Sequence, residues 1–107
     1  MARKRRVRND RNHIVYSLRN VVTGEFYIGV SAIIGQAKKK TLTERFRRHL
    51  SRAKNENKPW ALHESLRAYP DVKSWEKVVL AVVRGRKNAH QLERSFIDDH
   101  DPNLNTF

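Results

Sequence analysis

Apolar and polar residues alternate in two short runs near the start of the chain. Residues 13–19 and 25–30 place apolar side chains at every second position: Ile14, Tyr16, Leu18, Phe26, Ile28 and Val30. This alternation is typical of strands with one buried face. Residues 20–24 lie between the runs and contain Gly24, so they predict a turn that closes a hairpin, although Val21 and Val22 are not usual turn residues.

A helical period follows the hairpin. Thr41 and Glu44 have the spacing of a capping box, in which the threonine hydroxyl binds an early backbone N–H, and they predict that a helix begins there. The apolar stripe of this helix comprises Leu42, Phe46, Leu50 and Ala53, and another face carries Arg45, His49 and Arg52. Residues 59–69 predict a second helix, and Pro70 ends it.

The last third of the chain predicts one strand and one helix. Residues 75–83 (WEKVVLAVV) are almost continuously apolar after Lys77, which predicts a buried central strand. Asn88 is placed to cap a last helix whose buried positions would be Ala89, Leu92, Phe96 and Ile97. Together the segments predict an α+β fold, with a three-stranded antiparallel sheet flanked by helices in the order β-β-α-α-β-α.

The charge balance narrows the expected partners. Lys and Arg number 23 against 11 Asp and Glu, a formal net charge of +12, and such a surface attracts polyanions without reading their sequence. We expect no membrane partner, because no apolar run approaches the roughly 18 residues that span a bilayer. The basic N-terminus also lacks the apolar segment of a signal peptide.

Cysteine and histidine usage limits the metal chemistry. The chain has no cysteine, which excludes disulfides and thiolate zinc sites and leaves the cytoplasm as the default location. The five histidines form no HxxxH or HxH pair, so a structural zinc site is not expected.

Two basic segments stand apart from the predicted elements. Residues 1–12 contain six Arg or Lys and predict a flexible arm, either solvated or following phosphates, whereas residues 13–107 predict a single domain. Residues 31–40 contain Gly35 and three consecutive lysines. We expect them to form an exposed basic loop that either contacts DNA or only decorates the surface.

Five ordered landmarks carry a resemblance to a known family. The tripeptides at residues 14–16 and 27–29 are followed by Arg45 and His49 one helical turn apart, by Glu93, and by the ending PNLN at residues 102–105. This pattern resembles the GIY-YIG endonuclease family over residues 13–105. Ile14 stands where the family usually has glycine.

The resemblance implies the roles of the site residues. It implies that Tyr27 acts as the base toward a water nucleophile and that Arg45 stabilises the scissile phosphate. His49 would shuttle a proton, with a pKa near working pH, or bridge Tyr27 and the phosphate. Tyr16 would orient Tyr27 or the water. Glu93 would be the metal ligand for Mg²⁺ or Mn²⁺, and Asn105 would close the site or only cap the tail.

Each of these residues also has a structural reading. The tyrosines could be core aromatics with satisfied hydroxyls, Arg45 one cation among several, His49 a surface histidine, and Glu93 a solvated partner of Arg86 or Arg94. The expected DNA-binding residues are cations from the arm, the basic loop and the first helix: Arg5, Arg6, Lys38, Lys39, Lys40, Arg47, Arg48 and Arg52.

These observations predict a small stand-alone Mg²⁺-dependent DNA endonuclease of the kind that phages or mobile elements encode. The alternatives are a non-catalytic nucleic-acid-binding module on the same fold, or an RNA-associated basic protein that charge alone would support. The pattern leaves open whether the chain is a monomer or a homodimer, and whether it cuts one strand or two.

Overall fold

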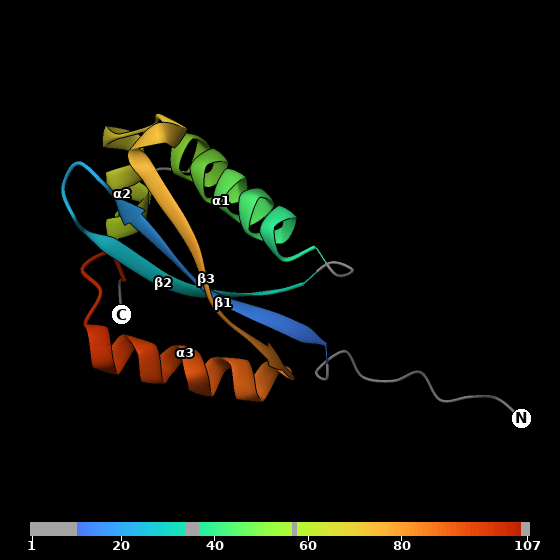
Figure 1. Ribbon diagram of the computed structural model, residues 1–107. Helices are drawn as coiled ribbons and strands as arrows, with labels where there is room; N and C mark the ends of the chain where they lie inside the picture. The colour runs from blue at the N-terminus through green and yellow to red at the C-terminus, as the bar shows by residue number, and fades with distance from the viewer. Residues whose placement is uncertain (1–10, 34–36, 57, 106–107) are drawn as a thin grey trace, which may run out of the picture.

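The computed structural model describes residues 11–33, 37–56 and 58–105. Its elements follow in the order β1 (Asn12–Asn20), β2 (Phe26–Ala32), α1 (Lys38–Asn55), α2 (Ala61–Ala68), a 3-10 turn (Val72–Ser74), β3 (Trp75–Arg84) and α3 (Arg86–His100), as Figure 1 shows. The predicted β-β-α-α-β-α order is confirmed. No helix in these described ranges is long and apolar enough to cross a membrane.

The described strands form one antiparallel sheet in the order β2-β1-β3. The hairpin prediction is correct, and its turn is held by Asn20, whose Oδ1 accepts from the backbone N–H of Val22 at 2.9 Å. Gly24 closes the turn with a φ of 80°, a left-handed conformation that glycine adopts without strain.

The prediction that residues 75–83 form a buried central strand is wrong. β1 is the central strand and β3 lies at an edge, where Val78, Leu80 and Val82 are 39%, 37% and 43% exposed. A continuous apolar run does not reveal which face of a strand is covered, and β3 is covered only in part. β3 also contains a β-bulge opposite β1. Val15 pairs with Ala81 and Tyr16 with Val79, so Leu80 is the extra residue without a pairing position on β1.

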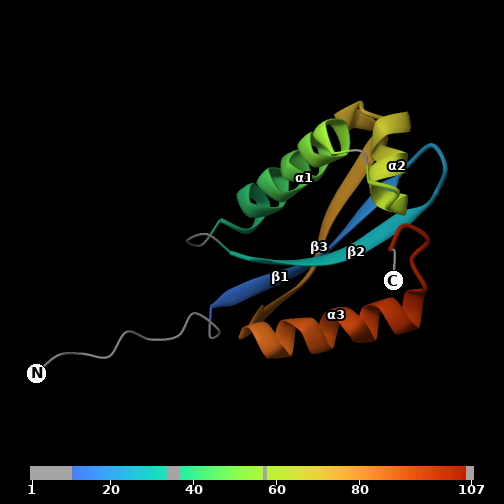
Figure 2. The same cartoon turned by 180° about the vertical axis from the view of Figure 1, so that it is seen from behind.

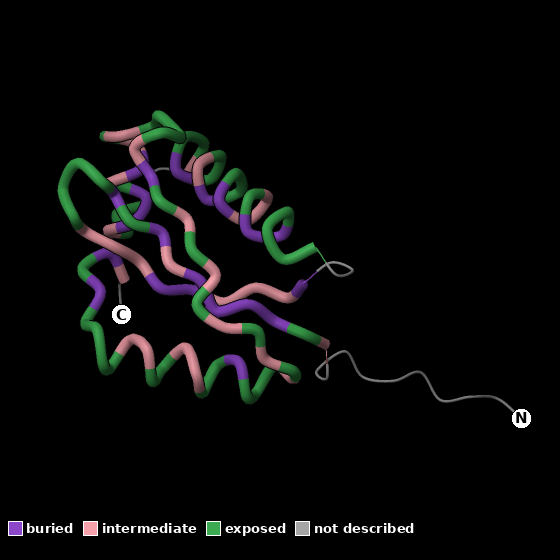
Figure 3. Tube along the Cα trace, in the orientation of Figure 1, coloured by how far each residue is buried: buried purple, intermediate pink, exposed green. Residues whose placement is uncertain are grey.

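The helices divide between the two faces of the sheet. α1 and α2 lie over one face and α3 over the other, as the two opposite views show (Figures 1 and 2). The core forms between the sheet and the α1–α2 layer; it contains Ile14, Tyr16, Leu18, Ile33, Leu42, Phe46, Ala53, Leu62, Leu66, Trp75 and Leu104. Figure 3 shows that buried residues cluster there and are scarce along α3.

Burial along α3 only partly matches the prediction. Ala89 is buried as expected, but Leu92, Phe96 and Ile97 are only half-buried. Of the described residues of α3, Ala89 alone is fully covered. The helical period therefore predicts correctly which face of α3 points inward, but that face is less buried than predicted.

The predicted starts of α1 and α3 are wrong. The run Lys38–Lys40 is the first turn of α1 rather than a loop, and Thr41 is buried inside the helix, where its N–H binds the carbonyl of Ala37 at 2.9 Å. α3 begins at Arg86, so Asn88 lies inside it and donates to the carbonyl of Arg84 instead of capping. Lysine favours helix, which extends α1 backward beyond the capping signal.

The last two residues of the segment predicted as an arm, Arg11 and Asn12, contact the folded domain or belong to it. Asn12 is already part of β1, and the Arg11 guanidinium donates to the carbonyl of Ile33 at 3.0 Å. Arg5 and Arg6 lie outside the described residues, so their predicted contact with DNA stays a prediction.

Candidate active site

The two tyrosines of the sequence pattern meet across the β1–β2 hairpin. Tyr16 on β1 pairs with Gly29 on β2, and its ring lies 6.3 Å from that of Tyr27. A Cβ at position 29 would lie 2.7 Å from both the Tyr16 hydroxyl and the Tyr27 ring. Gly29 therefore lets both rings pack over its backbone. Ile14, which replaces the family glycine, is fully buried in the core.

Helix α1 brings two more site residues to these rings. Arg45 and His49 lie one turn apart, so both face the sheet. The hydroxyl of Tyr16 lies 3.0 Å from Nε2 of His49, and Nε of Arg45 donates to the same hydroxyl at 3.4 Å. The His49 ring also meets the Tyr27 ring edge-on at 5.4 Å. Four residues far apart in sequence thus form one cluster.

The protonation of this cluster follows from its burial. Burial raises the pKa of both Tyr16 and Tyr27 above the usual value, and the Glu93 carboxylate raises both further. Arg45 opposes this and lowers the pKa of each phenol. Burial lowers the pKa of His49 to about 3, with the charge of Arg45 acting in the same direction.

His49 is therefore neutral at physiological pH. This corrects the expectation that its pKa lies near working pH, since the sequence pattern does not reveal that α1 buries the imidazole to 6% exposure. It is not a surface histidine, because its ring is buried and its Nε2 contacts the Tyr16 hydroxyl.

Glu93 approaches the phenols from the other helical layer. It lies on α3, its side chain is 21% exposed, and its carboxylate contacts Nδ1 of His90 at 3.3 Å. α3 packs against β1 and β2, the strands that carry Tyr16 and Tyr27, and the Glu93 carboxylate raises the pKa of both phenols.

The Glu93 carboxylate is a kind of donor that suits a magnesium ion. The described residues contain no group of three or more His, Asp or Glu side chains that could enclose a metal by themselves. One partly exposed carboxylate, completed by water and substrate oxygens, is a common way to hold Mg²⁺ and a poor way to hold zinc. Glu93 therefore fits the role of a magnesium ligand.

Asn105 acts on the outer edge of β2. Its side-chain amide donates to the carbonyl of Ile28 at 2.8 Å, and its Oδ1 accepts from the N–H of Ile28 at 2.9 Å. The N–H of Leu104 binds the carbonyl of Phe26 at 3.0 Å. The C-terminal segment thus pairs with β2 next to Tyr27, so both atoms of the amide serve to hold this segment in place.

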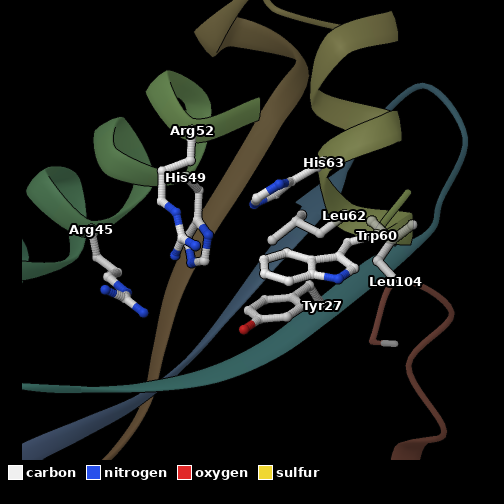
Figure 4. Close-up of a pocket in the computed structure, with 8 residues that line it drawn as sticks. All are labelled: Tyr27, Arg45, His49, Arg52, Trp60, Leu62, His63 and Leu104. Atoms are coloured by element: carbon white, nitrogen blue, oxygen red, sulfur yellow. The ribbon is translucent and has the colours of Figure 1, made fainter. Parts of the chain in front are cut away.

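A cavity of about 260 Å³ opens beside the cluster (Figure 4). It is lined by Tyr27, Arg45, His49, Arg52, Trp60, Leu62, His63 and Leu104. The sequence analysis did not assign Trp60, Leu62, His63 or Leu104 to the site, although Leu104 lies within the PNLN ending. Trp60 is the N-cap residue of α2 and His63 lies three residues later, a spacing that predicts only that both lie on one side of the helix, not that this side meets α1.

The predicted DNA-binding cations of α1 do not all lie together. Arg48 lines a second cavity of about 220 Å³ with Arg11 and Arg45, so Arg45 borders both cavities. Arg52 lines the first cavity, whereas Lys39 lines a third one near β3. Lys38, Lys40 and Arg47 are exposed along α1.

Comparisons with known proteins agree with the fold. The chain is similar to the catalytic domain of homing endonuclease I-TevI, with a TM-score of 0.64 and 14% identity over 89% of this chain and 95% of that chain. A point mutant of the catalytic domain of intron endonuclease I-TevI gives a TM-score of 0.67 and 15% identity, over 90% and 91%. No curated protein matches at a significant level. A family model described as the GIY-YIG catalytic domain matches residues 12–106, and the chain belongs to this family.

Proposed function

We propose that this protein is a Mg²⁺-dependent DNA endonuclease that hydrolyses phosphodiester bonds. The proposal depends on one observation: Tyr16, Tyr27, Arg45 and His49 converge beside one open cavity, with Glu93 in electrostatic range. The net charge of +12 suits a polyanionic substrate, and a small basic domain of this kind fits a nuclease of a phage or mobile element.

Arg45 is the residue we assign to the scissile phosphate. Its guanidinium lines the cavity and carries a permanent charge in a planar fork that can contact two phosphoryl oxygens. Mg²⁺ held by Glu93 would add positive charge where negative charge develops on the phosphoryl group.

Tyr27 is the residue we assign as general base. The raised pKa of Tyr27 means that it rests as a neutral phenol, so it first loses its proton to solvent in the open cavity. The phenolate then takes a proton from the water molecule that attacks phosphorus, the bond from phosphorus to the leaving ester oxygen breaks, and that oxygen takes a proton from solvent. Arg45 and Arg52 favour the ionisation of Tyr27, and neutralising the Glu93 carboxylate removes one of the two effects that oppose it.

Tyr16 and His49 position the base. A neutral His49 that carries its proton on Nε2 donates to the Tyr16 hydroxyl, which leaves the Tyr16 proton free to point at Tyr27. A hydrogen bond from Tyr16 lowers the pKa of Tyr27, because it stabilises the phenolate. The two buried residues thereby favour the reactive form of a third.

Cleavage of supercoiled plasmid with Mg²⁺ tests the proposal. The wild-type protein should give nicked or linear product, and Glu93→Gln should reduce the rate by about 10³-fold, as expected when several kcal/mol of charge stabilisation is lost. Glu76→Gln is the matched control, because it makes the same change in charge at an exposed residue that pairs with Arg19. It should cut like the wild type.

Two outcomes would contradict the proposal. Equal rates for Glu93→Gln and wild type would remove Glu93 from the mechanism. DNA binding without cleavage by the wild-type protein, at any Mg²⁺ or Mn²⁺ concentration, would favour the non-catalytic binding module instead.

A further inference from the structure

Trp60 is an exposed aromatic residue held in a fixed position. It directly precedes α2 and is 37% exposed, although α2 itself is anchored by the buried Leu62 and Leu66. The guanidinium of Arg67 ties down the preceding connection, because it donates to the carbonyls of Ala53 at 3.0 Å and Lys58 at 2.9 Å. The indole is therefore pre-organised rather than loosely attached.

The indole borders the cavity that contains the reacting groups. Trp60 and Tyr27 line the same cavity, and Figure 4 shows the indole pointing into it from the α2 side while Arg45 enters from α1. The lining is mixed: apolar and aromatic groups on the α2 side, guanidinium groups on the α1 side. A volume of about 260 Å³ lies just below the range of roughly 300–1,000 Å³ for sites of drug-sized ligands, so it suits one flat ring system.

Positive charges lie over the indole ring. The guanidinium carbon of Arg52 is 5.6 Å from the ring centroid, and Nζ of Lys58 is 5.0 Å from it. Both side chains are exposed, so a base that stacks on the indole would displace one of them from the ring face. These cations would repel a metal ion and attract the phosphates on either side of a nucleoside. A nucleotide combines a flat ring with an anionic backbone, which matches this arrangement better than a free anion or an apolar ligand does.

His63 supplies a second, independent observation. Its side chain is 2% exposed and its Nδ1 has no hydrogen-bond partner among the described residues. The His63 ring lines the cavity, 6.3 Å from the His49 ring and 5.0 Å from the Trp60 ring (Figure 4). A buried ring nitrogen without a partner costs free energy, and a turn of the ring toward the cavity would let a polar atom of a ligand satisfy it.

We infer that Trp60, His63, Arg52 and Lys58 form a subsite that stacks one unpaired nucleobase of the strand being cut, beside the phosphate held by Arg45. This Trp60 subsite rests on the proposed function and specifies its substrate. Bases inside an intact duplex are already stacked on their neighbours, so the subsite selects DNA that is single-stranded, bulged or opened at the cut.

Binding to a base-free strand tests the inference. Glu93→Gln protein without divalent cations is titrated with a short oligothymidine and with an abasic sugar-phosphate oligomer of equal length. Both carry the same charge, so their phosphate contacts are equal. The abasic oligomer should bind about 5- to 150-fold more weakly, the range expected for loss of one base–aromatic stack.

Substitutions at position 60 locate that difference. With Trp60→Ala added, the two oligomers should bind within about twofold of each other, whereas Trp60→Phe should keep most of the difference, because it keeps an aromatic face. Val82→Ala is the control, since it truncates an exposed apolar side chain on β3, outside the cavity. A difference that persists unchanged in Trp60→Ala would overturn the inference, as would equal binding of both oligomers by the parent protein.

Tryptophan fluorescence gives a second readout. The chain has two tryptophans, and Trp75 is buried with its Nε1 bonded to the carbonyl of Tyr69 at 2.8 Å. Oligothymidine should quench the wild-type emission and leave that of Trp60→Phe unchanged. Plasmid cleavage is measured separately. If the protein cuts plasmid but binds oligothymidine and the abasic oligomer equally, only the subsite is refuted. If it prefers oligothymidine but does not cut plasmid, only the proposed nuclease activity is refuted.

Discussion

The two faces of the sheet differ in how tightly they are covered. On the α1–α2 side, Ile14, Tyr16 and Leu18 are fully buried, and the helices contribute Leu42, Phe46 and Leu66 to the same core. On the other side, α3 contributes one fully buried residue, Ala89, among its described residues. The first face therefore supplies most of the packing energy.

The residues of the candidate site are divided between the same two faces of the sheet. Tyr16, Arg45 and His49 are fixed by the tightly packed face, so their mutual geometry is pre-organised. Glu93 comes from the loosely packed face, and in the proposed mechanism it would offer one carboxylate to a hydrated ion, whose water shell tolerates small displacements. The proposal thus needs accurate positioning only on the densely packed face.

The largest expected effect is a loss of cleavage with little change in stability. Tyr27→Phe removes a hydroxyl and no packing volume, so plasmid cleavage should fall by about 10²- to 10⁴-fold, the usual contribution of a general base. Thermal unfolding should change little, because Tyr27 is only partly buried. Cleavage by Tyr27→Phe at the wild-type rate would transfer the role of base to another group.

Core truncations compare the two faces directly. Leu66→Ala on α2 should destabilise the protein by about 2–5 kcal/mol, because Leu66 is fully buried. Phe96→Ala on α3 removes a larger side chain, yet it should cost about half of the 3–5 kcal/mol typical of a buried phenylalanine, since Phe96 is half-buried. Urea denaturation measures both, and a larger loss for Phe96→Ala would invert the comparison.

Acid should lower the free energy of unfolding, because His49 is buried on the tightly packed side of the sheet. Its pKa is about 3 in the folded protein against 6.5 as the reference value, so the unfolded chain binds more protons between these values. Stability is therefore full above pH 6.5 and is lost as the pH falls toward 3, by about 2 kcal/mol between pH 7 and pH 5.

His63 adds to this acid sensitivity, because burial also lowers its pKa. Urea unfolding across this pH range should be flatter for His49→Gln than for the wild type. An equally steep profile for that variant would show that other groups cause the acid sensitivity.

The smallest effect is expected at the uncovered edge of β3. Val82→Thr replaces an apolar group that is 43% exposed with a polar one of similar shape, and it should change the free energy of unfolding by less than about 0.5 kcal/mol. A loss of more than 1 kcal/mol in urea denaturation, as a rough threshold, would mean that something covers this strand in solution.

The sequence predicted elements whose signal is local. The hairpin, the order of elements and the inward face of α1 were readable because alternation and helical period depend on neighbouring residues. The position of β3 was not readable, since Val78, Leu80 and Val82 look the same in a central strand as at an edge. The start of α1 was missed because a local capping signal at Thr41 competed with lysines that favour helix.

The candidate site was likewise predictable only where the signal is local. The residues of the family pattern could be named in advance, but their protonation could not, because the low pKa of His49 comes from burial by elements far away in sequence. Trp60 and His63 belong to the cavity only after α2 folds back beside α1, and no spacing along the chain encodes that contact.

Both ends of the described chain border the cavities of the site. Arg11 lines the cavity that Arg45 shares with Arg48, and Leu104 lines the one that contains Tyr27 and Trp60. A DNA-reading module fused at either end would therefore be tethered next to the cutting centre, where a short linker gives an effective local concentration of about millimolar. Target choice could then be exchanged by fusion, without redesign of the catalytic scaffold.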